Sequence, residues 1–268
     1  MIKSNYHTHT NFCDGDCDVE SLVKIAVEKG FKYLGFSSHS YIEGDDLWTL
    51  KKDALNDYIE EVLIVKQKYK NQICVLLGIE QDVNSKIYDY NFDYVIGSKH
   101  SVVKDGKTYS IDYSLESFKN LLQNVYLGNF DALCKDYYSQ LKSVAVKTKA
   151  NVIGHVDIIT KYVDKLGLAL PKNYLSYAKD AIEEILKSAN VFEINTGAIA
   201  RGLKKEPYPS KDILSLIFNL GGKIIINSDC HNESGLDFGF DQAEKLAKSV
   251  GFKSRVIVTE KGFKDIKL

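Results

Sequence analysis

Seven short apolar segments alternate with longer amphipathic segments along this chain. Parallel strands need a long crossover between them, and helices between strands supply it. The pattern therefore predicts an α/β fold with parallel strands, either a closed or nearly closed (β/α)7 barrel of the TIM-barrel type or a doubly wound open sheet. The expected strands cover residues 2–6, 33–36, 73–77, 92–96, 151–154, 191–194 and 223–226.

The intervening segments carry apolar residues at helical spacing. The first begins at the candidate N-cap Asp18 and ends before Gly30. The region 114–149 reads as a helical insertion of two helices, broken near Gly128 and Asn129. A final apolar segment covers 256–258. No linker interrupts the pattern, so one barrel domain over 1–268 is simpler than two domains. Outside that insertion, the helices are expected at 18–29, 50–70, 174–189, 210–220 and 241–250.

Charge and cysteine content narrow the classes of partner and location. Lys and Arg total 35 against 36 Asp and Glu, so the chain has no general positive field for nucleic acid. The five cysteines are an odd, scattered set, the chain does not begin like a signal peptide, and no apolar run reaches the roughly 18 residues of a membrane span. We expect a cytoplasmic protein without membrane or nucleic-acid partners. Cys13 and Cys17 are not expected to be ligands.

All six histidines follow predicted strands, at or just beyond their carboxyl ends. Side chains two residues apart on a strand share a face, so His7 with His9, and Asp229 with His231, can each direct two ligands the same way. A barrel gathers the carboxyl ends of all its strands around one mouth, whereas an open sheet would spread them. The other polar residues expected at this mouth are His39, Glu80, His100, His155 and Asn195.

Imidazoles and carboxylates together suit Zn, Mn or Fe. The six imidazoles with Asp14, Glu80 and Asp229 make nine donors, too many for one catalytic ion with its typical three protein ligands. Two or three divalent ions are therefore predicted. Closely spaced ions activate water and bind phosphate oxygens, which makes phosphate-ester hydrolysis the leading reaction class.

Seven ordered motifs, spread over nearly the whole chain, resemble those of the polymerase and histidinol phosphatase (PHP) superfamily. They are His7-Thr-His9, the segment 11–15 with Asp14, Ser37-Ser-His39, Gly78-Ile-Glu80, Ile96-Gly-Ser-Lys-His100, Gly154-His155-Val-Asp157 and Asn227-Ser-Asp229-Cys-His231. Within the superfamily the chain looks most like the histidinol-phosphate phosphatases. The segments 93–100, 154–161 and 193–197, followed by Arg201 and 208–210, carry that closer likeness.

The resemblance implies a distorted (β/α)7 barrel that holds three divalent ions and hydrolyses L-histidinol phosphate to L-histidinol and phosphate. It implies attack by a hydroxide between the first two ions. Other branches have histidine at the position of Asp14, and an oxygen donor there weakens the preference for zinc at the third site and admits Mn or Fe. The implied ligand sets are His7, His9, Glu80 and Asp229 for the first ion, Glu80, His100 and His155 for the second, and Asp14, His39 and His231 for the third.

Other residues are candidates for binding and proton transfer. Asp229 and His231 are the expected route for the proton that reaches the leaving oxygen. Arg201, in a glycine-flanked loop, is the expected phosphate clamp, because a guanidinium can hold two phosphate oxygens. Lys161 is a second candidate for that role. An acidic residue is also expected to bind the amino group of the substrate. No sequence spacing identifies this residue, and Glu116 is a guess.

Three other functions fit parts of the pattern. A PHP-type nuclease or proofreading module would share the donors, but the charge balance and chain length count against it. A phosphoesterase for another small molecule would share the same chemistry. A noncatalytic metal-binding protein would be expected to have lost donors. The sequence leaves the oligomeric state and the native metal open.

Overall fold

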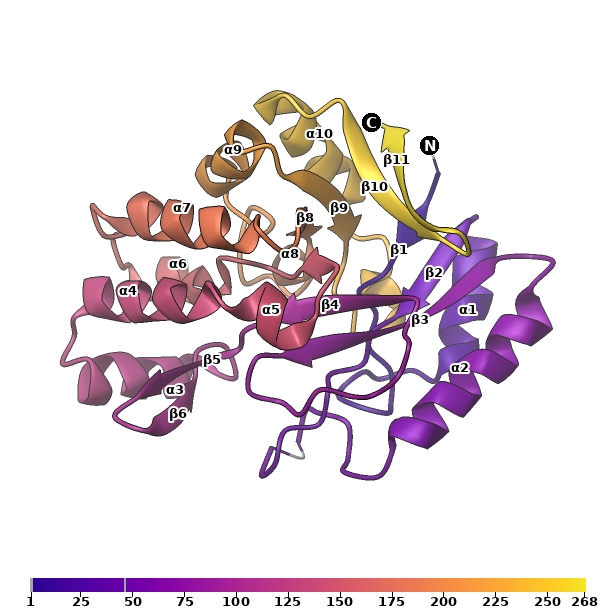
Figure 1. Ribbon diagram of the computed structural model, residues 1–268, viewed down its shortest axis with the longest axis horizontal. Helices are drawn as coiled ribbons and strands as arrows, with labels where there is room; N and C mark the ends of the chain where they lie inside the picture. The colour runs from indigo at the N-terminus through magenta and orange to yellow at the C-terminus, as the bar shows by residue number, and fades with distance from the viewer. Residues whose placement is uncertain (1, 46) are drawn as a thin grey trace.

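The structure is a computed structural model that describes residues 2–45 and 47–268. Seven parallel strands form one sheet, in the same order in space as in the chain, and helices surround it (Figure 1). The strands are uneven, from two residues in β1 to nine in β3, which distorts the barrel. Their bounds are β1 Ser4–Asn5, β2 Tyr33–Phe36, β3 Cys74–Asp82, β4 Tyr94–Ser98, β7 Val152–Ile153, β8 Val191–Asn195 and β9 Lys223–Asn227.

The first and last strands meet just beyond their carboxyl ends. A parallel bridge pairs Thr8 with Cys230, with His9 N–H donating to Cys230 O at 2.9 Å and Cys230 N–H to His7 O at 3.2 Å. The Tyr6 N–H also donates to Asn227 Oδ1 at 2.9 Å. The sheet is therefore a nearly closed barrel, which confirms the predicted architecture and excludes the open sheet. We propose that residues 1–268 form one domain, because both halves of the chain share this closure.

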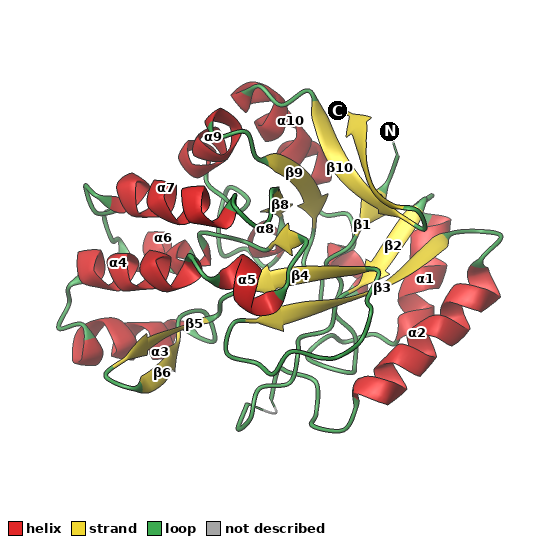
Figure 2. Cartoon of the chain, viewed as in Figure 1, coloured by secondary structure: helices red, strands yellow, loops and turns green. Residues whose placement is uncertain are grey.

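Helices cover the outside of the barrel, as Figure 2 shows. The Asp18 carboxylate caps α1 by accepting from Ser21 N–H at 2.8 Å, as the sequence predicts. None of the helices among the described residues is both long and apolar enough to cross a membrane. The helices are α1 Val19–Glu28, α2 Leu55–Tyr69, α3 Leu115–Asn120, α4 Phe130–Leu141, α5 Val144–Thr148, α6 Val163–Leu166, α7 Tyr174–Ile185, α8 Gly197–Ala200, α9 Lys211–Asn219 and α10 Phe240–Val250.

The predicted helical insertion contains more elements than expected. The break near Gly128 is present, where Leu127 and Gly128 have φ of 52° and 78°. Before it, α3 continues into a π-helical turn, Leu121–Val125, and after it α5 follows α4 as a separate short helix. The extra boundary comes after Leu141, where neither glycine nor proline marks it. Local sequence signals therefore locate one of the two interruptions.

Two β-hairpins were not anticipated. Residues 101–110 form β5 Ser101–Lys104 and β6 Lys107–Ser110, joined by Asp105 and Gly106 with φ of 50° and 74°. An Asp-Gly pair is a strong signal for such a tight turn, because both residues tolerate positive φ. The predicted apolar segment at 256–258 lies in β10 Ser254–Thr259, which pairs with β11 Gly262–Lys267.

The β10–β11 hairpin closes the amino-terminal end of the barrel. The Tyr6 hydroxyl donates to Val258 O at 2.9 Å, and both residues belong to one buried cluster with Tyr94. The Tyr94 ring fills the space left by Gly35 and Gly78, where a Cβ would overlap it. These side chains fill the centre of the barrel at its amino-terminal end.

We predict that Gly78→Ala lowers the free energy of unfolding by about 1–3 kcal/mol, because its methyl group would overlap the Tyr94 ring in a filled core. Urea denaturation measures the change. The matched control is Ser188→Ala at an exposed position, which is expected to change stability by less than about 0.5 kcal/mol. Equal stability of Gly78→Ala and the native protein would contradict the tight packing at Tyr94.

Candidate metal centre

The nine predicted donors lie together at the carboxyl end of the barrel. His7 and His9 follow β1, His39 follows β2, and Asp229 follows β9 with its backbone φ at +50°. Such a left-handed conformation is costly for a residue other than glycine and persists only where the surroundings hold it. The remaining donors are Asp14 before α1, Glu80 in β3, His100 after β4, His155 after β7 and His231 after β9.

The buried Glu80 carboxylate lies at the centre of the donors. Its Oε2 is 3.2 Å from His7 Nε2, and its Oε1 is 3.0 Å from His155 Nε2. One carboxylate therefore faces two groups of imidazoles, as expected of a bridging ligand. Three more ring nitrogens surround it: His39 Nδ1 at 2.7 Å and His9 Nε2 at 3.6 Å from Oε2, and His100 Nε2 at 3.4 Å from Oε1.

Asp229 completes the group around His7 and His9. Its Oδ1 lies 3.1 Å from His9 Nε2 and 3.7 Å from His7 Nε2. Its Oδ2 faces the other way and accepts from Arg201 Nη2 at 3.2 Å and Asn195 Nδ2 at 3.3 Å. The two oxygens of this carboxylate thus serve different neighbours.

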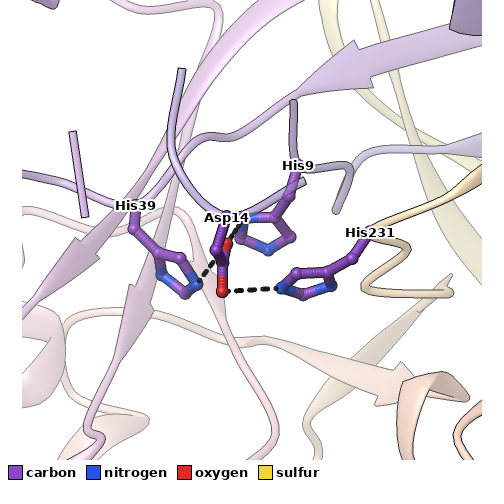
Figure 3. A group of neighbouring side chains, drawn as sticks. All are labelled: His9, Asp14, His39 and His231. Atoms are coloured by element: carbon purple, nitrogen blue, oxygen red, sulfur yellow. Dashed lines mark ion pairs between the residues drawn. The ribbon is translucent and has the colours of Figure 1, made fainter. Parts of the chain in front are cut away.

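Asp14 gathers a third group nearer the surface. Figure 3 shows its carboxylate between the rings of His9, His39 and His231. Its Oδ1 is 3.7 Å from His39 Nε2 and 3.9 Å from His9 Nδ1, and its Oδ2 is 3.3 Å from His231 Nε2. The His231 Nδ1 lies 3.0 Å from Asp229 O and 3.3 Å from Arg201 Nη1, so the Nε2 of the same ring is the nitrogen that faces Asp14.

These contacts bring the members of each implied ligand set together. Several donors also belong to alternative groups that could hold an ion, such as His39, Glu80 and His100, or His7, His155 and Asp229. The assignment of each donor to one of three ions therefore stays a prediction.

The donor chemistry fits divalent cations. Among the described residues, the buried atoms His7 Nε2, His9 Nε2 and Glu80 Oε2 have no hydrogen-bond partner, although they converge on one another. Unpartnered buried polar atoms are costly, and a shared cation satisfies all three. The protein therefore has a divalent metal centre at this end of the barrel.

The charges around this centre keep its carboxylates ionised. Burial alone would raise the pKa of Glu80, but the charges of His7, His39 and His100 outweigh it and hold that pKa well below its usual range. Burial and the neighbouring charges of His231 and His39 lower the pKa of His9 to about 3. Anionic carboxylates and a neutral imidazole are the forms that bind metal ions.

Two further buried carboxylates orient the candidate ligands from behind. His7 Nδ1 lies 2.7 Å from Glu193 Oε1, and His100 Nδ1 lies 3.1 Å from Asp82 Oδ2. Such contacts fix the tautomer that leaves Nε2 free to bind a metal. The sequence interpretation did not assign these roles. The signal was present, because Asp82 lies two residues after Glu80, and Glu193 two before Asn195, on the same strand faces.

The thiol of Cys13 lies behind His9, with Sγ 3.5 Å from Nδ1. Burial and the charge of Asp14 raise the pKa of this thiol to about 11. The sulfur thus contacts Nδ1, whereas Nε2 of the same ring faces Glu80 and Asp229.

A cavity of about 540 Å³ opens over the metal centre. This volume falls within the roughly 300–1,000 Å³ that is usual for small-molecule sites. Arg201 and Lys161 line it, as the sequence interpretation expected of residues that contact substrate. Arg201 donates to Asp229 O at 3.1 Å, while Lys161 donates to Asp112 O at 2.7 Å and lies 3.5 Å from its Oδ2. Of the two side chains, Arg201 therefore lies directly beside the candidate ligands.

Comparison with known proteins identifies the family. Residues 5–197 match the family described as PHP domain, and the chain belongs to that family. A histidinol-phosphatase of Bacillus subtilis is 22% identical, with 90% of this chain and 98% of the relative aligned.

Two solved structures share the fold. A candidate histidinol phosphatase of Listeria monocytogenes superimposes with a TM-score of 0.78 at 22% identity, covering 90% of this chain and 99% of that one. The histidinol phosphate phosphatase of Lactococcus lactis, solved with Zn, L-histidinol and phosphate, has a TM-score of 0.65 at 21% identity and covers 98% of both chains.

We predict that Glu80→Gln lowers the affinity for divalent metal by more than about 100-fold, because the amide removes the charge that faces both groups of imidazoles. Elemental analysis after equilibrium dialysis measures bound metal. Glu244→Gln is the matched control, since Glu244 is also buried but pairs with Lys248 on α10. Equal metal content in Glu80→Gln and the native protein would remove Glu80 from the centre.

Proposed function

We propose that this protein is a metal-dependent phosphomonoesterase that hydrolyses L-histidinol phosphate to L-histidinol and phosphate in histidine biosynthesis. The convergence of nine candidate metal donors, six of which line one cavity together with Arg201, carries the proposal. Membership of the PHP family supports it, as do relatives named histidinol-phosphatase that align over nearly their full length. We further propose a small phosphorylated substrate and a cytoplasmic location, with no nucleic acid or membrane as partner.

We propose three divalent ions at this centre, of Zn, Mn or Fe. The four overlapping groups of three or four donors support more than one ion, and the oxygen donor Asp14 weakens the preference for zinc at the outermost site and admits Mn or Fe. When bound, the ions would supply Lewis acidity toward phosphate oxygens and lower the pKa of water.

Arg201 orients the phosphate in this proposal. Its guanidinium lines the cavity and is held by the carboxylate and the backbone carbonyl of Asp229, so few side-chain rotations remain to be lost when a ligand binds. A planar guanidinium can donate two parallel hydrogen bonds to phosphate. The phosphate is thereby held beside the metal donors.

Asp229 and His231 handle the proton in this proposal. Water forms the new bond to phosphorus, the ester P–O bond breaks, and the proton released by water must reach the leaving oxygen. Asp229 Oδ2 faces Arg201 and so lies where phosphate would bind, whereas His231 Nε2 faces Asp14. We therefore propose Asp229 as the residue that passes the proton to the leaving oxygen, with His231 in a supporting role.

Asp112 is the proposed receptor for the substrate amino group. Its carboxylate lines the cavity, and Lys161 and the Tyr162 hydroxyl hold its backbone carbonyl at 2.7 and 2.9 Å. Glu116, the sequence-based guess, is exposed on α3 and is not part of the cavity lining. In this proposal, Lys161 positions Asp112 and adds positive charge to the phosphate side.

We predict phosphate release from L-histidinol phosphate by metal-replete protein, and its loss after chelation, because the donors alone cannot activate water. Malachite-green detection of phosphate measures the rate, and re-addition of Zn, Mn or Fe separately identifies the effective metal. A single-stranded oligonucleotide is the comparison substrate. Nucleotide release from it, without phosphate release from L-histidinol phosphate, would replace the proposed activity by that of a nuclease.

We predict that Arg201→Ala raises KM or lowers kcat/KM for L-histidinol phosphate by about 10- to 100-fold, the range of one lost charged hydrogen-bond pair. Arg201→Lys is expected to recover part of the loss, since an ammonium keeps the charge without the planar pair of donors. Steady-state kinetics with matched metal content measures both variants. Unchanged kinetics in Arg201→Ala would exclude the phosphate clamp.

A further inference from the structure

Trp48, the only tryptophan of the chain, lies at the metal centre on the loop between β2 and α2. Its ring centroid is 4.8 Å from that of His39 and 5.3 Å from that of His100, with interplanar angles of 83° and 65°. The two imidazoles belong to different implied ligand sets. The indole therefore lies across the rim of the metal centre.

Core packing does not account for this indole. Within the part of the chain that the structure describes, Trp48 joins none of the three hydrophobic clusters of the core. It lines the cavity over the metal centre and also a second cavity of about 390 Å³, which Glu43 and Thr108 help to line. The Trp48 side chain therefore lines both cavities. A large aromatic surface that faces open space on two sides is typical of a ligand contact.

The lining of the cavity over the metal centre combines charged and apolar side chains. Arg201 and Lys161 contribute positive charge, while Leu47, Trp48 and Tyr113 contribute apolar surface. Leu47 is 79% exposed and Tyr113 is 60% exposed, although both lie at a binding cavity. Apolar side chains that stay exposed at a cavity mouth indicate that the ligand has an apolar part.

We propose that Trp48 determines specificity for the leaving group, by packing its indole against a planar ring of the substrate. This inference rests on the proposed function and assigns to Trp48 the recognition of the ring that L-histidinol phosphate carries. The contacts to phosphate are the same for every monoester and so cannot discriminate among them. Discrimination must come from the part of the substrate that differs, and Trp48 is the largest apolar surface beside the metal donors.

The kinetic test compares two esters that share phosphate and ammonium groups. L-Histidinol phosphate has the ring, and L-alaninol phosphate lacks it. Trp48→Ala is expected to lower kcat/KM for the ring ester by about tenfold, the equivalent of one aromatic pair, and for the aliphatic ester by less than about threefold. Trp48→Phe is expected to recover most of the loss. The control Leu170→Ala removes an apolar side chain that is 47% exposed outside the cavity, and it is expected to change neither value.

A binding test uses the single indole as its own probe. L-Histidinol added to the metal-replete protein is expected to change the tryptophan fluorescence in a saturable manner, because its ring would pack on Trp48. L-Alaninol is expected to leave the fluorescence unchanged. Identical responses to the two alcohols would overturn the ring contact.

The outcomes separate this inference from the proposed function. An equal loss of kcat/KM on both esters in Trp48→Ala would overturn the specificity role. A loss of bound metal in the same variant would mean that Trp48 only supports His39 and His100. Full activity of Trp48→Ala on both esters would overturn it as well. If the native protein released no phosphate from L-histidinol phosphate, the proposed function would fall. Hydrolysis of phenyl phosphate would then be compared with that of ethyl phosphate, in the native protein and in Trp48→Ala. A preference of the native protein for phenyl phosphate that Trp48→Ala loses would support ring selection by Trp48, and any other result would overturn it.

Discussion

The metal centre depends on the charge of one buried carboxylate, that of Glu80. Its two oxygens face five imidazole nitrogens that come from four different strand ends, those of β1, β2, β4 and β7. A charge buried this deeply is tolerated only where positive groups surround it. Protons on the imidazoles or divalent cations can fill that need, and only the cations also satisfy the converging lone pairs of His7 and His9. The barrel geometry serves this arrangement by bringing every strand end to one mouth.

The same backbone that closes the barrel carries four of the donors. The bridge between Thr8 and Cys230 lies between His7 and His9 on one strand end, and between Asp229 and His231 on the other. Metal binding and closure of the barrel are therefore coupled. A shift of one strand end relative to the other would displace the candidate ligands on both sides of the bridge. The left-handed backbone of Asp229 is held by this junction and directs its two oxygens to different neighbours.

The sequence predicted the barrel and the convergence of the nine candidate donors, because both follow from local rules. Apolar segments marked the seven strands, and the two-residue spacing of His7 and His9 marked their shared face. The hairpin at Asp105 and Gly106 could also have been predicted from its turn residues. Glu193 and Asp82 were not assigned, although their two-residue spacing from Asn195 and Glu80 places them on the same strand faces, because that spacing alone does not tell a supporting carboxylate from a ligand. Trp48 could not be assigned, because its position depends on how a long loop folds across two distant imidazoles.

The β10–β11 hairpin has a consequence for how the chain can be combined with other domains. It seals the base of the barrel, and both ends of the chain emerge beside it (Figure 1). A protein fused at either end would thus be attached on the side opposite to the catalytic mouth. A linker that joined the two ends would likewise lie on this side and leave the entrance to the metal centre unobstructed.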